Sequence, residues 1–368
     1  MTDRRQFLQI AAGTAGLVGL GAAGFFSRAQ AADAAMIEPA AKPLSILFLG
    51  GTGFIGPHQV EHALARGHEV SMFNRGRKSG YYGDRVEELT GDRDATKDEG
   101  LSALQGDRTW DVVIDNSGYV PRHVRDSVEL LKDRCKRYIY VSTVAVYPDV
   151  PGVFAEDAPL AELADPTVEE VTGETYGPLK AECDRIVRAA LGDRCTIVRP
   201  TFIVGPGDTT DRFTYWVDRV HRGGDIVGPA HGDVAVQVVD VQDLCPWIVT
   251  LAENDTPGVF NAAGPAYTRA GLVWGVRATS EADVTFHWPT AAQAEELDMP
   301  SPMLDWGTAS SVYPGTASLA AGMSYRSLMD SALGTLDWWQ GQPAERRAKA
   351  RRWPTEQQEM GALAKLKG

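Results

Sequence analysis

A glycine-rich turn near residue 50 constrains the fold of this chain more than any other segment. The apolar run 44–49 precedes the turn, which reads Gly50-Gly51-Thr52-Gly53-Phe54-Ile55-Gly56. A helical pattern over 55–66 and a second apolar strand over 69–73 follow it. Glycines let the backbone approach an anionic ligand closely, and the N-terminus of the next helix directs unpaired N–H groups at that ligand. This context favours a dinucleotide-binding turn, and the alternative is a strand-to-helix turn with a structural role only.

The following residues alternate between apolar strands and amphipathic helices. We expect strands over 86–90, 111–115, 137–142 and 195–199, and helices over 95–104, 120–131 and 178–191. Parallel strands need helical crossover connections, so this alternation predicts a parallel sheet with helices on both faces. The expected fold class is therefore α/β, a doubly wound Rossmann sheet followed by a smaller C-terminal substrate-binding region.

Beyond Pro200 the pattern becomes less regular. We expect helices over 211–221 and 243–252, strands over 234–239 and 259–262, and a last helix over 325–339. The predicted organisation is a dinucleotide-binding domain at 44–200, a substrate-binding region at 201–340 that completes the sheet edge, and a charged tail at 341–368. Ligands of doubly wound folds bind at the carboxyl edge of the sheet, which the second region is expected to cap. The tail is expected to be a solvated surface.

The first 31 residues have the pattern of an export signal. Arg4 and Arg5 precede a weakly apolar stretch rich in alanine and glycine, and a small-x-small site follows at 29–31. This order indicates a twin-arginine signal peptide at 1–31, a linker at 32–43 and an exported protein, periplasmic or extracellular. The alternative is an uncleaved membrane anchor.

Charge and cysteine usage limit the classes of partner. The formal net charge is −13 over 368 residues, and an acidic chain is a poor general ligand for nucleic acid or anionic lipid. The four cysteines show no metal-ligand or close paired spacing, so we expect four buried thiols at 135, 183, 195 and 245. His58 and His62 share a helix face without a third ligand, and no metal site is predicted.

A tyrosine and a lysine open the helix predicted after the fifth strand. Tyr176 and Lys180 are four residues apart and would share a helix face. A nearby ammonium would lower the pKa of the phenol toward the working range of a general acid or base. Taken alone, this spacing more often marks an aromatic residue packed near a surface lysine. Here strand 137–142 also ends in Ser142-Thr143, which places hydroxyl groups at the carboxyl edge of the sheet.

Together these motifs resemble the short-chain dehydrogenase/reductase superfamily, and in particular its extended branch, the NAD-dependent epimerase/dehydratase family. The resemblance covers residues 44 to about 265. It implies that Thr143, with Ser142 as a second candidate, hydrogen-bonds the substrate oxygen. It also implies that Tyr176 moves the substrate proton, and that Lys180 holds the nicotinamide ribose while tuning the phenol.

The resemblance also assigns the cofactor residues. The glycine turn matches the family's glycine motif, Asp92 its adenine-contacting acid, and Pro200-Thr201 its nicotinamide-side loop. The full expected set is Gly50, Thr52, Gly53, Phe54, Ile55, Gly56, Asn74, Arg75, Arg77, Lys78, Asp92, Arg93, Asn116, Ser117, Pro200 and Thr201.

The second strand ends differently from the usual NAD pattern. In place of a carboxylate for the adenosine ribose hydroxyls, the chain reads Asn74-Arg75-Gly76-Arg77-Lys78. Three cations suit a ribose 2′-phosphate, so NADP is expected over NAD, and a solvated basic loop is the alternative. Because free cofactor is not expected to be regenerated outside the cytoplasm, we expect an exported enzyme to hold NADP tightly and return it unchanged.

The resemblance places Arg212 and Gln237 on the substrate side, and Tyr147 is expected either to face the substrate or simply to pack. Arg212 suits an anionic or polyhydroxyl substrate, and an ion pair with Asp208 or Asp211 is its structural alternative. The predicted function is an epimerase or oxidoreductase that acts on a hydroxyl or carbonyl group of a sugar-like substrate. The alternatives are a reductase of a non-sugar carbonyl compound and a non-enzymatic dinucleotide- or RNA-binding protein, because 74–76 and 91–94 also resemble plastid RNA-binding relatives of the family.

The expected partners follow from these predictions. They are a small-molecule substrate, the twin-arginine export machinery and, by the resemblance, a second copy in a homodimer. No nucleic acid and no stable membrane span of the mature chain are expected.

Overall fold

The first half of the molecule is built on one parallel sheet. The computed structural model describes residues 37–297, 299–304, 310–351 and 353–367, so the predicted signal peptide lies outside the described residues. The sheet has the strand order β11-β7-β5-β4-β1-β2-β3, and every neighbouring pair is parallel. Its strands are β1 (Ser45–Leu49), β2 (Glu69–Asn74), β3 (Glu87–Thr90), β4 (Trp110–Asp115), β5 (Cys135–Val141), β7 (Cys195–Pro200) and β11 (Gly258–Ala262).

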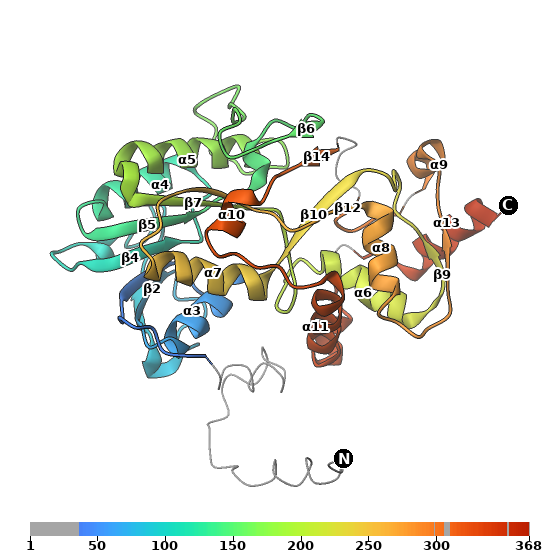
Figure 1. Cartoon of the computed structure of the whole chain (residues 1–368), viewed down its shortest axis with the longest axis horizontal. Helices are drawn as coiled ribbons and strands as arrows, with labels where there is room; N and C mark the ends of the chain where they lie inside the picture. Colours follow the sequence, from blue (N-terminus) through green and yellow to red (C-terminus); the bar gives the residue numbers. More distant parts are fainter. Residues whose placement is uncertain (1–36, 298, 305–309, 352, 368) are drawn as a thin grey trace, which may run out of the picture.

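Helices cover both faces of this sheet (Figure 1). Helices α4 (Pro121–Leu131) and α5 (Tyr176–Leu191) lie on one face, and α3 (Ile55–Ala65) and α7 (Val241–Glu253) lie on the other. Strand β1 shows why, since successive side chains point to opposite faces. Ile46 and Phe48 are buried in the cluster under α3 and α7, whereas Leu47 and Leu49 are buried under α4 and α5. The doubly wound α/β prediction is confirmed.

The helix expected over 95–104 is wrong. The chain forms turns there, with left-handed backbone at Asp98 (φ 47°) and Gly100 (φ 50°), and only a short 3₁₀ helix at Ser102–Leu104. The carbonyl of Gly100 turns back to accept the N–H of Asp92 at 3.0 Å. This contact closes the segment onto the end of β3, so the connection from β3 to β4 contains no α-helix.

The second half forms a separate lobe around short sheets. A three-stranded sheet has the order β12-β10-β8, and β13 pairs with β9 in a parallel two-stranded sheet. Helices α6, α8 and α11 pack on the aromatic core around Trp216 and Phe213. The bounds are β8 (Phe202–Val204), α6 (Arg212–Arg222), β9 (Gly224–Val227), β10 (Ala235–Asp240), β12 (Ala266–Thr268), α8 (Arg269–Arg277), β13 (Val284–His287), α9 (Ala291–Glu296), α10 (Thr316–Ala320) and α11 (Leu328–Gln340).

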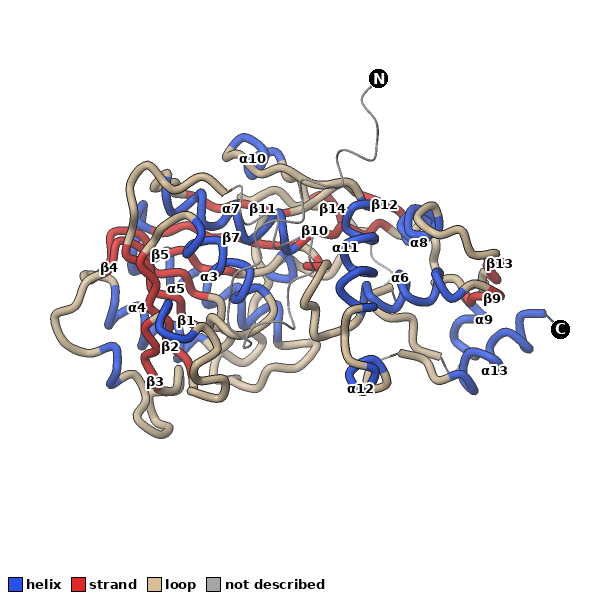
Figure 2. Tube along the Cα trace, turned by 90° about the horizontal axis from the view of Figure 1, so that it is seen from below, coloured by secondary structure: helices blue, strands red, loops and turns tan. Residues whose placement is uncertain are grey.

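The charged tail differs from the solvated surface we expected. It forms α12 (Ala344–Arg347) and α13 (Glu356–Lys367), which lie along the C-terminal lobe (Figure 2). The guanidinium of Arg346 donates two hydrogen bonds to the buried carboxylate of Asp211, at 2.5 and 3.0 Å. The Trp353 ring packs against Trp339, with ring centroids 5.2 Å apart. Residues of the tail therefore complete the core of this lobe.

A joint built on two short strands connects the two halves beyond the chain crossings at β8 and α7. Strand β14 (Ser311–Val312), from the C-terminal half, pairs in parallel with β6 (Gly152–Val153), which follows β5 in the first half. The rings of Tyr147, Phe154 and Tyr313 stack beside this pair, with centroids 5.5 to 6.2 Å apart. Side chains from distant parts of the sequence thus hold the halves together.

Three further features bear on the sequence analysis. All four cysteines are buried free thiols. Within the part of the chain that the structure describes, no group of His, Cys, Asp or Glu side chains could hold a metal ion. Over the same residues, every helix is too short or too polar to cross a bilayer.

Candidate functional site

The glycine turn lies between β1 and α3, and the two residues that follow β4 hold it in place with hydrogen bonds. A side chain on Gly56 would place its Cβ 2.4 Å from the carbonyl carbon of Gly51, so only glycine allows α3 to start so close to the turn. Asn116 donates to the carbonyl of Gly50 at 3.1 Å, and the hydroxyl of Ser117 donates to that of Leu49 at 3.0 Å. Asn116 and Ser117 therefore lie at the predicted cofactor edge and hold the turn in place.

The basic segment after β2 lies beside the same turn. Lys78 donates to the carbonyl oxygen of Thr52 at 2.8 Å, and Arg75 and Arg77 are exposed. The amide oxygen of Asn74 accepts the N–H of Gly76 at 2.6 Å. Its amide nitrogen is buried and has no hydrogen-bond partner among the described residues. A buried donor without an acceptor suits an oxygen-rich group such as a ribose or a phosphate.

The two residues predicted at the adenine differ in their surroundings. Asp92 uses one carboxylate oxygen to accept the N–H of Asp94 at 2.8 Å. Arg93 turns inward and donates to both carboxylate oxygens of Asp115, at 2.6 and 2.9 Å, and to the Ser127 hydroxyl at 2.8 Å. Asp115 is fully buried at the end of β4. Arg93 therefore pairs with a buried carboxylate at the carboxyl edge of the sheet. Its contact with a cofactor stays a prediction.

Lys180 is enclosed at the bottom of the site. Its ammonium donates to the carbonyls of Gly118, at 2.7 Å, and Val141, at 2.8 Å. It also lies 4.1 Å from the centroid of the Tyr140 ring and 5.3 Å from that of Tyr119. Burial lowers the pKa of the lysine to about 8. Two of its three N–H groups thus donate to backbone carbonyls, and contact of Lys180 with a ribose stays a prediction.

Tyr176 and Thr143 meet at the start of α5. Tyr176 is the first residue of the helix, and its phenol lies near the Thr143 hydroxyl. Burial raises the pKa of Tyr176 to about 12, while the Thr143 hydroxyl and the positive charge of Arg212 act in the opposite direction. We expected Lys180 to lower this pKa, but its ammonium faces two backbone carbonyls, and Arg212 is the cation that does so.

Arg212 comes from the other half of the molecule, at the start of α6. Its Nε donates to the Thr210 hydroxyl at 2.9 Å, and its guanidinium lies 5.2 Å from the Phe202 ring centroid. Asp211, one of its two expected ion-pair partners, is bonded to Arg346 instead. The positive charge of Arg212 acts on the phenol of Tyr176, and the contact of Arg212 with substrate stays a prediction.

Pro200 and Thr201 lie at the end of β7, beside the hydroxyl pair. The Thr201 hydroxyl is buried without a hydrogen-bond partner among the described residues. Arg199, just before them, is fully buried and pairs at 2.9 Å with Asp184, which lies one helical turn after Lys180. The Ser142 hydroxyl is buried and has no hydrogen-bond partner among the described residues. It lies near the Asp184 carboxyl, where Arg199 and this hydroxyl oppose the rise in the pKa of Asp184 that burial causes.

Tyr147 and Gln237, expected at the substrate, are engaged in the joint between the halves. The hydroxyl of Tyr147 donates to the amide oxygen of Asn261 at 2.8 Å. The Gln237 side chain accepts the N–H of Tyr313 at 2.7 Å and donates to its carbonyl at 3.0 Å, as well as to the Gly264 carbonyl. Their hydrogen-bonding capacity is used internally, and their contact with substrate stays a prediction.

Sequence reasoning missed two residues of this site. Tyr119 has 46% of its surface exposed, and its ring lies 6.3 Å from that of Tyr176 and covers the ammonium of Lys180. Nothing in the residues around Tyr119 signals this position. Asp184 is different, because its spacing of four from Lys180 places it on the same face of α5. That spacing could have found it.

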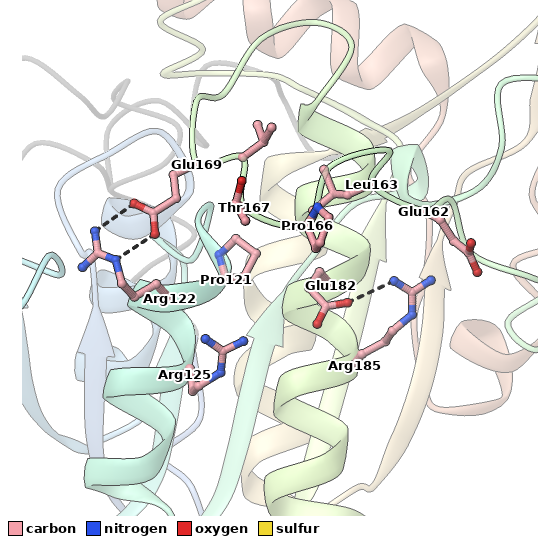
Figure 3. A pocket seen from close by; sticks show the side chains of 11 residues that line it. Pro121, Arg122, Arg125, Glu162, Leu163, Pro166, Thr167, Glu169, Glu182 and Arg185 are labelled. Carbon is pink, nitrogen blue, oxygen red and sulfur yellow. Dashed lines mark hydrogen bonds and ion pairs between the residues drawn. The ribbon is translucent and has the colours of Figure 1, made fainter.

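A groove lies on the outer side of helices α4 and α5 and is lined by other residues. Figure 3 shows this groove of about 630 Å³ between α4, α5 and the segment 162–169, into whose rim arginines and glutamates project. Arg122 is paired with Glu169 and Arg185 with Glu182. None of the predicted site residues lines this groove.

A comparison with models of protein families identifies the family of this chain. Residues 46–263, more than half of the chain, match the model of the NAD dependent epimerase/dehydratase family. The chain belongs to this family. Membership confirms the predicted enzyme class, an NAD(P)-dependent oxidoreductase of the epimerase/dehydratase type.

Solved structures of the family share the fold. A UDP-glucuronic acid 4-epimerase from Bacillus cereus, in complex with NAD, is 17% identical over 82% of this chain and 99% of its own, with a TM-score of 0.61. A dTDP-glucose 4,6-dehydratase from Bacillus anthracis, also with NAD, is 17% identical over 84% of this chain and all of its own, with a TM-score of 0.63. WbmG from Bordetella bronchiseptica, with NAD and UDP, is 18% identical over 82% and 95%, with a TM-score of 0.62.

One curated relative is a plant protein. The chloroplast stem-loop binding protein of 41 kDa b from Arabidopsis thaliana is 27% identical over 253 residues. The match covers 63% of this chain and 62% of the relative, so the chain spans less than two thirds of that protein's length.

Proposed function

We propose that this chain is an exported NADP-dependent epimerase or oxidoreductase that acts on a hydroxyl or carbonyl group of a sugar-like substrate. Tyr176 moves the proton, Thr143 binds the reacting oxygen, and Lys180 holds the nicotinamide ribose. The observation that carries the proposal is the convergence of these three side chains, from β5 and α5, at the carboxyl edge of the sheet.

The residues at this edge fit a dinucleotide. The glycine turn suits a pyrophosphate at the start of α3, and the buried polar groups of Asn74 and Thr201 have no partner among the described residues, which supports roles for them at the adenosine and the nicotinamide. When bound, a nicotinamide accepts and returns a hydride. No cluster of carboxylates or metal ligands among the described residues offers a different chemistry there.

The side chains divide the proton chemistry between them. With its pKa raised to about 12, the phenol of Tyr176 carries its proton at neutral pH and donates it to a carbonyl oxygen. In the opposite direction, the positive charge of Arg212 and the Thr143 hydroxyl stabilise the phenolate that receives the substrate proton. The Thr143 hydroxyl also binds the substrate oxygen and fixes its distance from the phenol.

The choice of NADP rests on the segment after β2. Arg75 and Arg77 are exposed beside the glycine turn, to which Lys78 is tied, and Asn74 offers a buried amide donor in place of a carboxylate. A 2′-phosphate is a better partner for these groups than two ribose hydroxyls are. Equilibrium binding of NADPH and NADH checks this choice, since tighter binding of NADH contradicts it.

Export supports a reaction that returns its cofactor unchanged. The twin-arginine pathway carries folded proteins, so NADP bound in the cytoplasm leaves with the chain. Oxidation and re-reduction of one substrate then need no external reductant, and a free or glycosidic sugar suits this location better than a nucleotide sugar. Cell fractionation tests the route, because Arg4→Lys with Arg5→Lys should leave the chain in the cytoplasm.

Replacing Tyr176 by phenylalanine tests the chemistry. The purified chain is incubated with a panel of free and glycosidic sugars, and epimer formation and nicotinamide absorbance are followed. Tyr176→Phe should lower turnover by at least about 100-fold with the cofactor still bound, because only the proton donor is lost. Tyr267→Phe, on β12, serves as the control and should match the wild type. Equal turnover in Tyr176→Phe would refute the assignment.

RNA binding is a second candidate, favoured by the name of the curated relative. The net charge of −13 opposes it, because phosphate contacts dominate affinity for nucleic acid. A stem-loop RNA retained at physiological salt, with equal affinity in the wild type and Tyr176→Phe, would favour this candidate.

A further inference from the structure

The loop that follows β8 lies against the helix that starts the cofactor site. This loop, residues 205–208 (Gly205-Pro206-Gly207-Asp208), belongs to the C-terminal half, whereas α3 belongs to the sheet half. The imidazole Nε2 of His58, on the first turn of α3, is 2.9 Å from the carbonyl oxygen of Pro206. The two halves thus meet directly beside the glycine turn.

Gly207 brings the loop into close contact with this turn. Its φ of +88° lies in the left-handed region, which favours glycine. A Cβ at this position would lie 3.3 Å from Nε2 of His58 and 3.7 Å from the Phe54 ring. Phe54 belongs to the glycine turn, and its ring meets that of His58 edge to face, with centroids 6.4 Å apart. The loop therefore rests on both side chains at once.

The chemistry of His58 fixes the direction of its hydrogen bond. A carbonyl oxygen only accepts, so Nε2 must carry the hydrogen and donate to Pro206. Burial lowers the pKa of His58 to about 4, and the imidazole is therefore neutral at physiological pH. The bond is a neutral contact that salt does not screen.

The rest of the loop is held by buried groups. Gly205 lies against the Asp240 carboxylate, which a Cβ at Gly205 would approach to 3.0 Å. The carboxylate of Asp208, 1% exposed, accepts the N–H and hydroxyl of Thr210 at 2.8 and 2.7 Å. Buried groups therefore hold the loop on both sides of Pro206, and the contact of Pro206 with His58 joins it to α3.

We propose that His58 is a positioning residue that closes the 205–208 loop over the pyrophosphate end of the cofactor site, so that NADP leaves only after this contact opens. The inference rests on the proposed function and adds to it the device that retains the cofactor. It also links the two sites, because four residues after Asp208 the same segment carries Arg212, whose charge acts on the phenol of Tyr176.

Displacement of NADPH measures the effect. The full chain is loaded with NADPH and mixed with a large excess of NADP, and the loss of NADPH fluorescence gives the release rate. His58→Ala should release NADPH about tenfold faster, the effect of one lost hydrogen bond and its packing. His58→Gln, which keeps an amide donor near the position of Nε2, should remain within about threefold of the wild type. His62→Ala, one turn further along α3, should leave the rate unchanged.

A second variant distinguishes loss of the His58 contact from misfolding of His58→Ala. Gly207→Ala leaves His58 intact but places a methyl group against it, so it should also accelerate release. Wild-type rates in both His58→Ala and Gly207→Ala, in variants whose thermal unfolding matches the wild type, would overturn the inference and leave the proposed function standing. If the wild-type chain binds neither NADPH nor NADH, the proposed function fails, and the inference fails with it.

Discussion

In the half built on the parallel sheet, three residues chosen for chemistry lie together, whereas in the C-terminal half one of the expected substrate residues is used to hold the molecule together. Thr143, Tyr176 and Lys180 meet at one edge, although Thr143 and Lys180 are 37 residues apart in the sequence. The side chain of Gln237, in the C-terminal half, forms hydrogen bonds with the backbone of Tyr313.

The difference comes from how each half fixes the direction of a side chain. Parallel strands in one sheet end at one edge, so a hydroxyl after β5 must lie near a phenol that starts the helix leading into β7. The C-terminal half is made of short strands and long connections. The direction of Gln237 there depends on a segment 76 residues further along the chain.

The largest predicted effect is in the sheet half. Arg93→Met should destabilise the chain by about 3–5 kcal/mol, because it leaves the fully buried carboxylate of Asp115 without its cation. Urea unfolding monitored by tryptophan fluorescence gives the free energy of unfolding. Arg85→Met breaks a pair with Glu61 in which the arginine side chain is 50% exposed, and should cost less than about 1 kcal/mol. Similar losses in both variants would contradict a buried structural role for Arg93.

Much of the sheet half could be predicted from local pattern. The strand expected at 195–199 is Cys195–Pro200, and the helix expected from 178 begins only two residues earlier, at Tyr176. Apolar periodicity determines which face of a strand or helix is buried, and the glycine turn marks where the first strand ends. These signals are contained within a few residues, so they can be read without knowing the fold.

The polar contacts that the sequence analysis did not foresee share a physical cause, which is a partner far away in the sequence. Arg93 was expected at the cofactor, and the partners that it has in the structure, Asp115 and Ser127, lie 22 and 34 residues away. The tail was expected to be solvated because it is charged, but Arg346 pairs with Asp211, 135 residues before it. Composition and periodicity carry no information about such pairs.

The contact between the halves should make the fold sensitive to acid. The pKa of His58 is lowered from 6.5 in the unfolded chain to about 4 in the fold. A depressed folded-state pKa contributes stability that is present above about pH 6.5 and is lost as the pH falls toward 4. The wild type should lose about 2–3 kcal/mol more than His58→Gln across this window. Denaturant unfolding at several pH values measures the difference, and parallel profiles would show that His58 is not buried neutral.

The smallest effect tests whether Gln237 joins the halves or serves the substrate. Gln237→Leu keeps the volume but leaves the N–H and carbonyl of Tyr313 without their partner, and should cost about 1–2 kcal/mol. If the side chain is a joint, the Tyr313 amide should lose hydrogen-exchange protection while the NADPH affinity stays unchanged. Gln340→Leu, on the exposed end of α11, should change neither. Unaltered protection at Tyr313 combined with a raised KM for the sugar would instead place Gln237 at the substrate, and the two halves would then use their polar residues alike.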